Sequence, residues 1–265
     1  MALDAGMVAC LCHEFNEKII GAKVDKIYQP SKDELLFSMR AGARAEKLLL
    51  SCASNSPMVC LTEEKFENPL TAPMLCMLLR KHLAGGRLLS VSQPEFERVI
   101  IFEFSCLDEM GDPCTKYMVA ELLGKFSNII LLNSQKRILG AVKTVDFSAS
   151  EKRQILPGFV YELPPKQDKF NPLIETKEGF IQKISGRDTR ADQYILSTYA
   201  GLSPLMAREI VYKASKMTDA HLADCDIEKI WFYFKQVVGL SLIHIYPIFA
   251  SSYRVRGRHC GAFRY

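Results

Sequence analysis

The stretch RLLSVSQPEFERVIIFEF, residues 87–104, organises the rest of the chain. It predicts a strand that ends near Gln93-Pro94, a turn, and a second strand that opens with Glu97-Arg98. Residues 99–102 of the second strand are wholly apolar, so both faces of this strand are expected to be buried. The polar pair Glu97-Arg98 therefore stands at the mouth of a rigid strand.

Two interpretations of Glu97-Arg98 stay open at this point. An adjacent acid and base at a strand end commonly form a solvated surface ion pair, which adds little to stability. Alternatively, the guanidinium offers a planar fork of donors to phosphate or base edges, and the carboxylate accepts hydrogen bonds from base amino groups. The second interpretation predicts a nucleic-acid partner.

Length and composition set the bounds. A chain of 265 residues holds one large domain or two smaller ones, and its 48% apolar content is enough for a packed core. The net charge of +4 leans toward an anionic partner without proving one. No apolar run reaches the length of about 18 residues that spans a membrane, and the N-terminus lacks the basic start of a signal peptide. A cytoplasmic protein without a membrane partner is expected.

The nine cysteines are scattered and form no C-x-x-C motif. Disulfide frameworks and zinc sites need paired, closer spacing, so reduced thiols and no metal are expected. The sequence also lacks a phosphate-binding loop and a Ser/His/Asp set. Neither a cofactor nor an independent catalytic site is therefore predicted.

Residues 1–172 alternate short apolar runs with turn residues, which predicts an α+β domain with a β-sandwich core and two flanking helices. The first helix spans residues 5–20 with Asp4 at its N-cap, and the second follows Thr71 as N-cap and ends at Gly85-Gly86. The proline-rich residues 148–173 predict a linker. The expected strands are 23–28, 34–39, 47–52, 58–61, 87–91, 99–104, 116–123, 128–132, 138–139 and 142–145.

Residues 173–239 change to helical periodicity, and the expected helices are 177–184, 192–199, 204–215 and 227–238. The turn AGLSP, residues 200–204, resembles a helix-hairpin-helix turn, although Ser203 replaces its second glycine. A plain packing joint between two helices is the alternative. Residues 240–265 show neither helical nor strand periodicity and are expected to be an aberrant tail outside the fold.

Six separated motifs resemble the bacterial RqcH branch of the RqcH/NEMF family, across residues 1–239. They are MALDAG at 1–6, KIYQP at 26–30, PMLCMLLRKHLAGGRL at 73–88, Glu97-Arg98, ELLGKFSNIILLN at 121–133 and ILPGFVYELPP at 155–165. The resemblance implies a first domain similar in fold to the N-terminal domain of formamidopyrimidine-DNA glycosylases, followed by helix-hairpin-helix elements.

The resemblance also implies a function in ribosome quality control. Such proteins bind a stalled large (50S) ribosomal subunit that carries peptidyl-tRNA, and they recruit alanyl-tRNA for template-free alanine tailing of the nascent chain. Complete members continue into a coiled-coil arm and a C-terminal domain. This sequence has neither, so it is expected to be an N-terminal fragment that binds tRNA weakly and does not stay on the subunit.

Residue by residue, the resemblance places tRNA contact on Glu97 and Arg98, with Asp4 as a further acid and residues 121–129 on the same surface. The family usually has Asp-Arg, so the carboxylate of Glu97 lies one methylene farther out. The carboxylate of Glu121 is suited to accept from guanine N1 and N2 in an unpaired anticodon, with complementary backbone groups near Ile129. The alternatives are a helix cap for Asp4 and an exposed strand residue for Glu121. The candidates for phosphate contacts are Arg80, Lys81, Arg87 and Lys125.

Two other functions compete with this one, a DNA-glycosylase-like enzyme and a surface adhesin. A DNA-glycosylase-like enzyme would need an N-terminal proline amine, and this chain has Ala2-Leu3-Asp4 instead, so DNA is not an expected partner. A fibronectin-binding surface adhesin is the other alternative, because relatives have carried that label, but the sequence shows neither a signal peptide nor an anchor motif.

Overall fold

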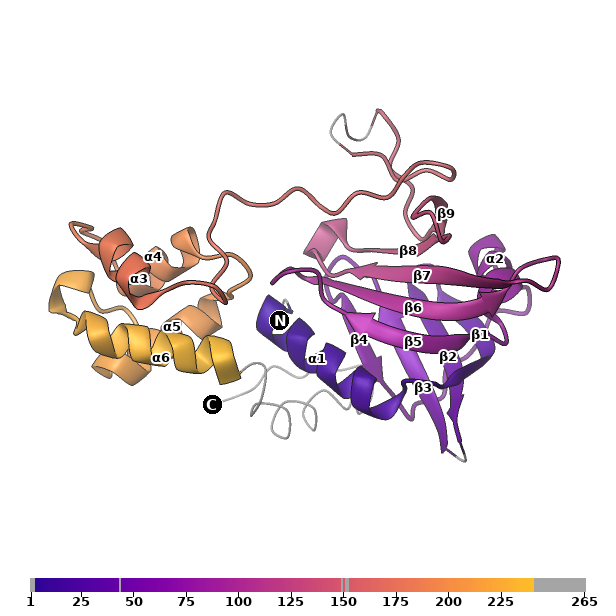
Figure 1. Ribbon diagram of the computed structural model, residues 1–265, viewed down its shortest axis with the longest axis horizontal. Helices are drawn as coiled ribbons and strands as arrows, with labels where there is room; N and C mark the ends of the chain where they lie inside the picture. The colour runs from indigo at the N-terminus through magenta and orange to yellow at the C-terminus, as the bar shows by residue number, and fades with distance from the viewer. Residues whose placement is uncertain (1–2, 43, 149, 151–152, 241–265) are drawn as a thin grey trace.

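A computed structural model describes residues 3–42, 44–148, 150 and 153–240. Within these residues, a large sheet is followed by a group of helices (Figure 1). The tail expected at 240–265 lies outside the described residues, apart from Leu240, where the last helix ends.

Nine strands form one sheet in the order β4-β3-β2-β1-β5-β6-β7-β8-β9, and every neighbouring pair is antiparallel. The protein therefore has a mixed α/β fold with a large antiparallel sheet. The expected β-sandwich of two sheets is not observed as such, because β1 and β5 are hydrogen-bonded and join the two halves into one sheet. The strands are β1 (Lys23–Ser31), β2 (Glu34–Ala41), β3 (Arg44–Ser51), β4 (Met58–Leu61), β5 (Arg87–Ser92), β6 (Val99–Leu107), β7 (Pro113–Glu121), β8 (Asn128–Leu132) and β9 (Ile138–Ala141).

The joint between the two halves of the sheet is short. Lys23 and Arg87 form its one pair in register, and the N–H of Val24 donates to the carbonyl of Gly86 over 2.8 Å. A Cβ at Gly86 would lie 2.8 Å from the Sγ of Cys106. Two backbone oxygens, of Leu83 and Ser105, would lie 3.1 Å from the same Cβ, so glycine is favoured where the chain enters β5.

One face of the sheet carries the main hydrophobic core, covered by α1 (Ala5–Lys18) and α2 (Met74–Leu83). Phe102 of β6 is fully buried there, and its ring centroid lies 5.9 Å from that of Phe15 of α1. Val99, on the same strand, points to the other face and is also buried, at 1% exposure. The expectation that both faces of this strand are buried is confirmed.

The second face is covered by part of the segment that was expected to be a linker. We call residues 153–161 the strap. Ile155 of the strap packs with Val99, Val119 and Ile130, and its backbone exchanges two hydrogen bonds with Val145. The expected strand 142–145 is thereby reduced to this single bridge, and the strap belongs to the sheet unit rather than to a free linker.

The helix starts follow from local capping. The Oδ1 of Asp4 accepts from the N–H of Met7 over 2.9 Å, so Asp4 is the N-cap of α1, as expected. The prediction of Thr71 as N-cap is wrong: α2 begins at Met74, and Pro73 occupies the cap position without a side-chain hydrogen bond. Pro73 fits there because its missing N–H would have no partner at a helix start.

The helical unit has its own core. Phe180 and Tyr199 stack with ring centroids 5.9 Å apart, and Phe234 lies 4.7 Å from Tyr199. In the part of the chain that the structure describes, no helix is long and apolar enough to cross a membrane. The remaining helices are η1 (Gly124–Phe126), α3 (Lys177–Ile184), α4 (Ala191–Thr198), α5 (Pro204–Ser215), η2 (Leu222–Asp224) and α6 (Ile227–Leu240).

Phe102→Ala should lower the free energy of unfolding by about 3–5 kcal/mol, because it removes a fully buried ring and leaves a cavity in the main core. Urea unfolding followed by circular dichroism measures the loss. Phe147→Ala is the matched control, since Phe147 is 63% exposed and its removal should cost less than about 1 kcal/mol. Equal losses for the two variants would contradict this description of the core.

Candidate functional site

A cleft of about 190 Å³ lies where the sheet unit meets the helical unit. Three of the residues proposed from the sequence for tRNA contact line it together, although they come from different points of the chain: Asp4, Glu97 and Arg98. We call it the interdomain cleft. The other lining residues are Leu3, Gln167, Lys169, Ala200, Gly201, Leu202, Ser203 and Pro204.

The carboxylate of Asp4 joins the two units. While its Oδ1 caps α1, its Oδ2 accepts from the hydroxyl of Ser203 over 2.7 Å. The Oγ of Ser203 in turn accepts from the N–H of Met206 over 3.3 Å and caps α5. The helix-cap interpretation of Asp4 is confirmed, and the cap is also a contact with the helical unit.

The turn before α5 needs Gly201. Its φ is +75°, and a Cβ there would lie 2.6 Å from the carbonyl oxygen of Phe96 and 2.7 Å from the Cβ of Ala5. The carbonyl of Gly201 accepts from the N–H of Ala5 over 2.9 Å. Ser203, which weakened the helix-hairpin-helix resemblance, therefore serves as a cap, while Gly201 permits the close approach.

Glu97 and Arg98 are half-buried at the start of β6, and among the described residues neither side chain forms an ion pair or a hydrogen bond. The structure thus does not show the surface ion pair that was the alternative interpretation. The amide of Gln93 holds the turn by donating to the carbonyls of Ala5 and Glu97 over 2.9 and 2.7 Å. Burial raises the pKa of Glu97, and the charge of Arg98 opposes this shift.

Lys169 and Gln167 also line the cleft, and the sequence analysis did not single them out. Both lie in the segment that was expected to be a linker, where composition gives no signal of function. The cleft therefore has two cationic side chains, Arg98 and Lys169, facing two carboxylates, Asp4 and Glu97. Such a mixed lining suits a ligand that offers both phosphate oxygens and N–H donors.

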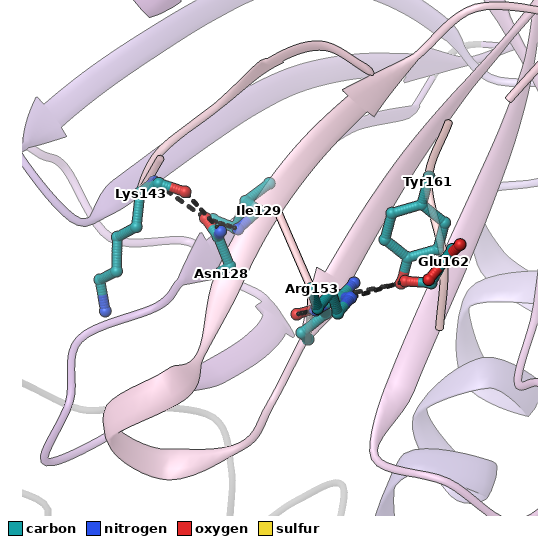
Figure 2. Close-up of polar contacts among 7 residues, drawn as sticks. Asn128, Ile129, Lys143, Arg153, Tyr161 and Glu162 are labelled. Atoms are coloured by element: carbon teal, nitrogen blue, oxygen red, sulfur yellow. Dashed lines mark hydrogen bonds and ion pairs between the residues drawn. The ribbon is translucent and has the colours of Figure 1, made fainter. Parts of the chain in front are cut away.

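Glu121 lies elsewhere and is buried. Its side chain is 1% exposed, and both of its carboxylate oxygens accept from the guanidinium of Arg153, one of them over 3.1 Å. The hydroxyl of Tyr161 donates to the same carboxylate over 2.8 Å, and the Nε of Arg153 donates to the carbonyl of Glu162 over 2.8 Å. Figure 2 shows Arg153 directed toward Tyr161 and Glu162.

This geometry corrects one expectation for Glu121. It is not an exposed strand residue, because the strap covers it, and its carboxylate already has partners within the protein. Its contact with a tRNA base stays a prediction. Burial raises the pKa of the Tyr161 hydroxyl, and the charge of Glu121 raises it further. What the carboxylate does here is to fasten the strap to the sheet.

The backbone of Ile129 is also engaged. Its N–H donates to the Oδ1 of Asn128 over 2.9 Å, and its carbonyl accepts from the N–H of Val142 over 2.9 Å. Asn128 bonds further to the backbone of Lys143, as Figure 2 shows. The N–H and the carbonyl of Ile129 thus already have partners within the protein, and tRNA contact from the backbone near Ile129 stays a prediction.

The four candidates for phosphate contact lie away from the cleft and have partners of their own. Arg80 donates to the carbonyl of Ile27 over 2.8 Å, and Lys81 pairs with Glu109 over 2.6 Å. The guanidinium of Arg87 donates to the carbonyl of Gly21 over 3.1 Å. The ammonium of Lys125 lies 4.9 Å from the ring centroid of the adjacent Phe126. Their phosphate contacts stay a prediction.

Within the described residues, no group of three or more His, Cys, Asp or Glu side chains is placed to hold a metal ion. The cysteines described there are free thiols. Burial raises the pKa of two of them, Cys12 and Cys60, to about 12. Such thiols stay protonated at neutral pH and act as apolar core side chains.

The chain is similar to known proteins over most of its length. A family model described as NFACT N-terminal and middle domains matches residues 4–241. The Rqc2 homolog RqcH of Bacillus subtilis (strain 168) is 37% identical over 215 residues, which make up 81% of this chain. The same match covers only 38% of that relative, so this chain spans well under half of its length.

Two solved structures share the fold. The fibrinogen binding protein from Staphylococcus aureus superposes with a TM-score of 0.77 at 28% identity, covering 91% of this chain and 83% of that one. The N-terminal part of the fibronectin/fibrinogen-binding protein from Streptococcus suis gives 0.76 at 29% identity, covering 88% and 84%. The expected similarity to the glycosylase N-terminal domain stays a prediction, because the likeness to the MutM (Fpg) protein from Thermus thermophilus has a TM-score of only 0.37.

Ser203→Ala should lower the free energy of unfolding by about 1–2 kcal/mol, because it removes the cap of α5 together with the donor to Asp4. Ser203→Thr keeps the hydroxyl and should stay within about 0.5 kcal/mol of the unmodified protein. Thermal unfolding of both variants measures the difference. Indistinguishable stabilities would show that the link between the units contributes nothing.

Arg153→Met should lower the free energy of unfolding by about 3–5 kcal/mol, because it leaves the carboxylate of Glu121 buried without its cation. Combining it with Glu121→Gln removes the unpaired charge, so the double variant should recover part of the loss. Denaturant unfolding of the two single variants and the double variant gives the coupling energy. Simple additivity of the two single effects would rule out the pair as the fastening of the strap.

Proposed function

This chain belongs to the RqcH/NEMF family, and we propose that it acts in ribosome quality control by binding tRNA in the interdomain cleft. The observation that carries the proposal is the convergence of Asp4, Glu97 and Arg98 on one cleft. In this proposal the full task is that of the longer relatives: recruitment of alanyl-tRNA to a 50S subunit that holds peptidyl-tRNA, for template-free alanine tailing.

The roles of the cleft residues follow from their chemistry. Arg98 has a guanidinium without a partner among the described residues, so it is available for a charge-assisted bond to a phosphate or a base edge. Glu97 supplies the acceptor for base N–H groups, and Asp4 holds the helical unit in place beside them. Glu121 acts in this proposal through the strap, and not by touching a base.

The proposal assigns binding, and not independent catalysis, to this chain. The cleft offers carboxylates and cations that position a nucleic acid, and the chemistry of tailing would take place on the ribosome. Phosphate contacts from Lys169 in the cleft would add affinity without adding sequence preference.

A second candidate is binding of fibronectin or fibrinogen. The observation that favours it is the similarity to solved structures that carry those names. This function would be recognition of a protein rather than of tRNA, so binding measurements with both kinds of partner distinguish the two proposals.

Arg98→Ala should raise the Kd for tRNA roughly 10- to 150-fold, which corresponds to the loss of about 1.5–3 kcal/mol from one charge-assisted contact. The Arg98 side chain is half-buried at a strand end and has no partner among the described residues. The substitution should therefore change the free energy of unfolding by less than about 1 kcal/mol. Binding of an alanine tRNA and a non-cognate tRNA is measured by fluorescence anisotropy at fixed salt, since affinity depends on salt.

The matched control is Arg137→Ala. Arg137 is exposed, directly precedes β9, does not line the cleft and donates to the carbonyl of Gly158. Unchanged tRNA affinity for Arg98→Ala would remove the cleft from the proposal. Immobilised fibronectin and fibrinogen form a second arm. Specific capture of the chain by either protein, with no tRNA binding, would favour the second candidate function.

A further inference from the structure

A second cavity, of about 730 Å³, lies in the helical unit beside the interdomain cleft. Its lining combines an aromatic ring with charges of both signs and a hydroxyl: Phe170, Lys183, Arg187, Asp168, Asp188 and Thr189. None of these residues takes part in the function proposed above, and none was singled out from the sequence.

Residues 167–170 form the wall between the two cavities. Gln167 and Lys169 line the interdomain cleft, whereas Asp168 and Phe170 line the second cavity. The chain bends at Asp168, where the N–H of Lys169 donates to the carbonyl of Gln167 over 2.8 Å, so neighbouring residues of this turn line different cavities. The backbone of Phe170 fixes this wall to the end of α4, because its N–H donates to Thr198 and its carbonyl accepts from Ala200, each over 2.9 Å.

The two cavities are therefore neighbours, separated by residues 167–170, and one extended ligand can contact both. The two cavities differ in what they offer. The cleft supplies charges, and the second cavity adds an aromatic surface.

The ring of Phe170 is 55% exposed, although the backbone of this residue is hydrogen-bonded to Thr198 and Ala200. The ammonium of Lys183 lies 4.4 Å from the ring centroid, and both carboxylate oxygens of Glu175 accept from it over 2.9 and 2.8 Å. The ring is thus positioned while much of its surface remains open. Exposed aromatic rings of this kind stack on unpaired bases in proteins that bind single-stranded RNA.

The charges around the ring narrow the class of ligand. The guanidinium of Arg187 forms no ion pair or hydrogen bond within the described residues, so it is free for a phosphate. Asp168 and Asp188 would repel a simple anion, but their oxygens accept from the N–H groups of a base. An aromatic ring, a cation and carboxylates together suit a nucleotide better than either an inorganic anion or an apolar molecule.

We infer that the second cavity binds one unpaired nucleotide of the RNA that occupies the interdomain cleft, with its base on Phe170 and its phosphate on Arg187. The inference rests on the proposed function, and it names an additional contact for the same RNA. It predicts that the chain distinguishes RNA with unpaired bases from fully paired RNA.

The experiment measures binding of the full chain to a tRNA transcript and to a blunt RNA duplex of similar length, at fixed salt. Phe170→Leu keeps the apolar bulk but removes the ring, and it should weaken tRNA binding about tenfold, as expected for the loss of one stacked base. Binding of the duplex should not change. Phe170→Tyr keeps the ring and should bind tRNA as the unmodified protein does.

Arg187→Gln should also weaken tRNA binding and should reduce its salt dependence by about one phosphate contact. Phe147→Ala, at another exposed phenylalanine outside both cavities, is the control and should leave both affinities unchanged. Circular dichroism of each variant shows whether the fold is kept, and Phe170→Tyr separates loss of the ring from local disturbance.

The outcomes separate this inference from the proposed function. If Arg98→Ala weakens tRNA binding while Phe170→Leu and Arg187→Gln do not, the second cavity is not a nucleotide site and the proposed function stands. If Phe170→Leu weakens tRNA and duplex equally, stacking of an unpaired base is overturned. If the unmodified chain binds no RNA, both proposals fail.

Discussion

The arrangement of this protein depends on one carboxylate. Asp4 caps α1 with one oxygen and accepts from the Ser203 hydroxyl with the other, and Ser203 in turn caps α5. One pair of side chains thereby accepts hydrogen bonds from backbone N–H groups at the starts of two helices that lie far apart in the sequence. Because the capping geometry fixes both helices, it also fixes the walls of the cleft between them, where Gly201 lies against Ala5 and Phe96.

A buried charge, that of Glu121, secures the path of the chain between the two units. Glu121 would be costly to bury alone, and the guanidinium of Arg153 together with the hydroxyl of Tyr161 makes the burial tolerable. The chain therefore crosses the sheet at the strap, and Lys169, which follows later in the sequence, lines the cleft. Glu121, whose carboxylate chemistry suits a base edge, thus holds the strap that precedes the cleft-lining residues Gln167 and Lys169.

The chemistry of the cleft is mixed rather than simply basic. Arg98 and Lys169 would attract the phosphates of any nucleic acid, whereas Glu97 and Asp4 penalise a ligand that brings no N–H donors. The raised pKa of Glu97 reflects the cost of holding that carboxylate half-buried without a partner. The proposed function matches this balance to RNA that presents base edges, a preference that the overall net charge of +4 does not indicate.

The sequence by itself determined the local elements and the key dipeptide. Apolar periodicity placed β6 and its buried faces, and Asp4 read correctly as a cap, because both signals are encoded within a few neighbouring residues. Only the tertiary structure decided that the strands form one sheet, that Glu121 is covered, that residues 153–161 pack on the sheet, and that residues 167–170 line the cavities. Pairing of β1 with β5 and of Arg153 with Glu121 joins residues 64 and 32 positions apart, and no local pattern specifies such contacts.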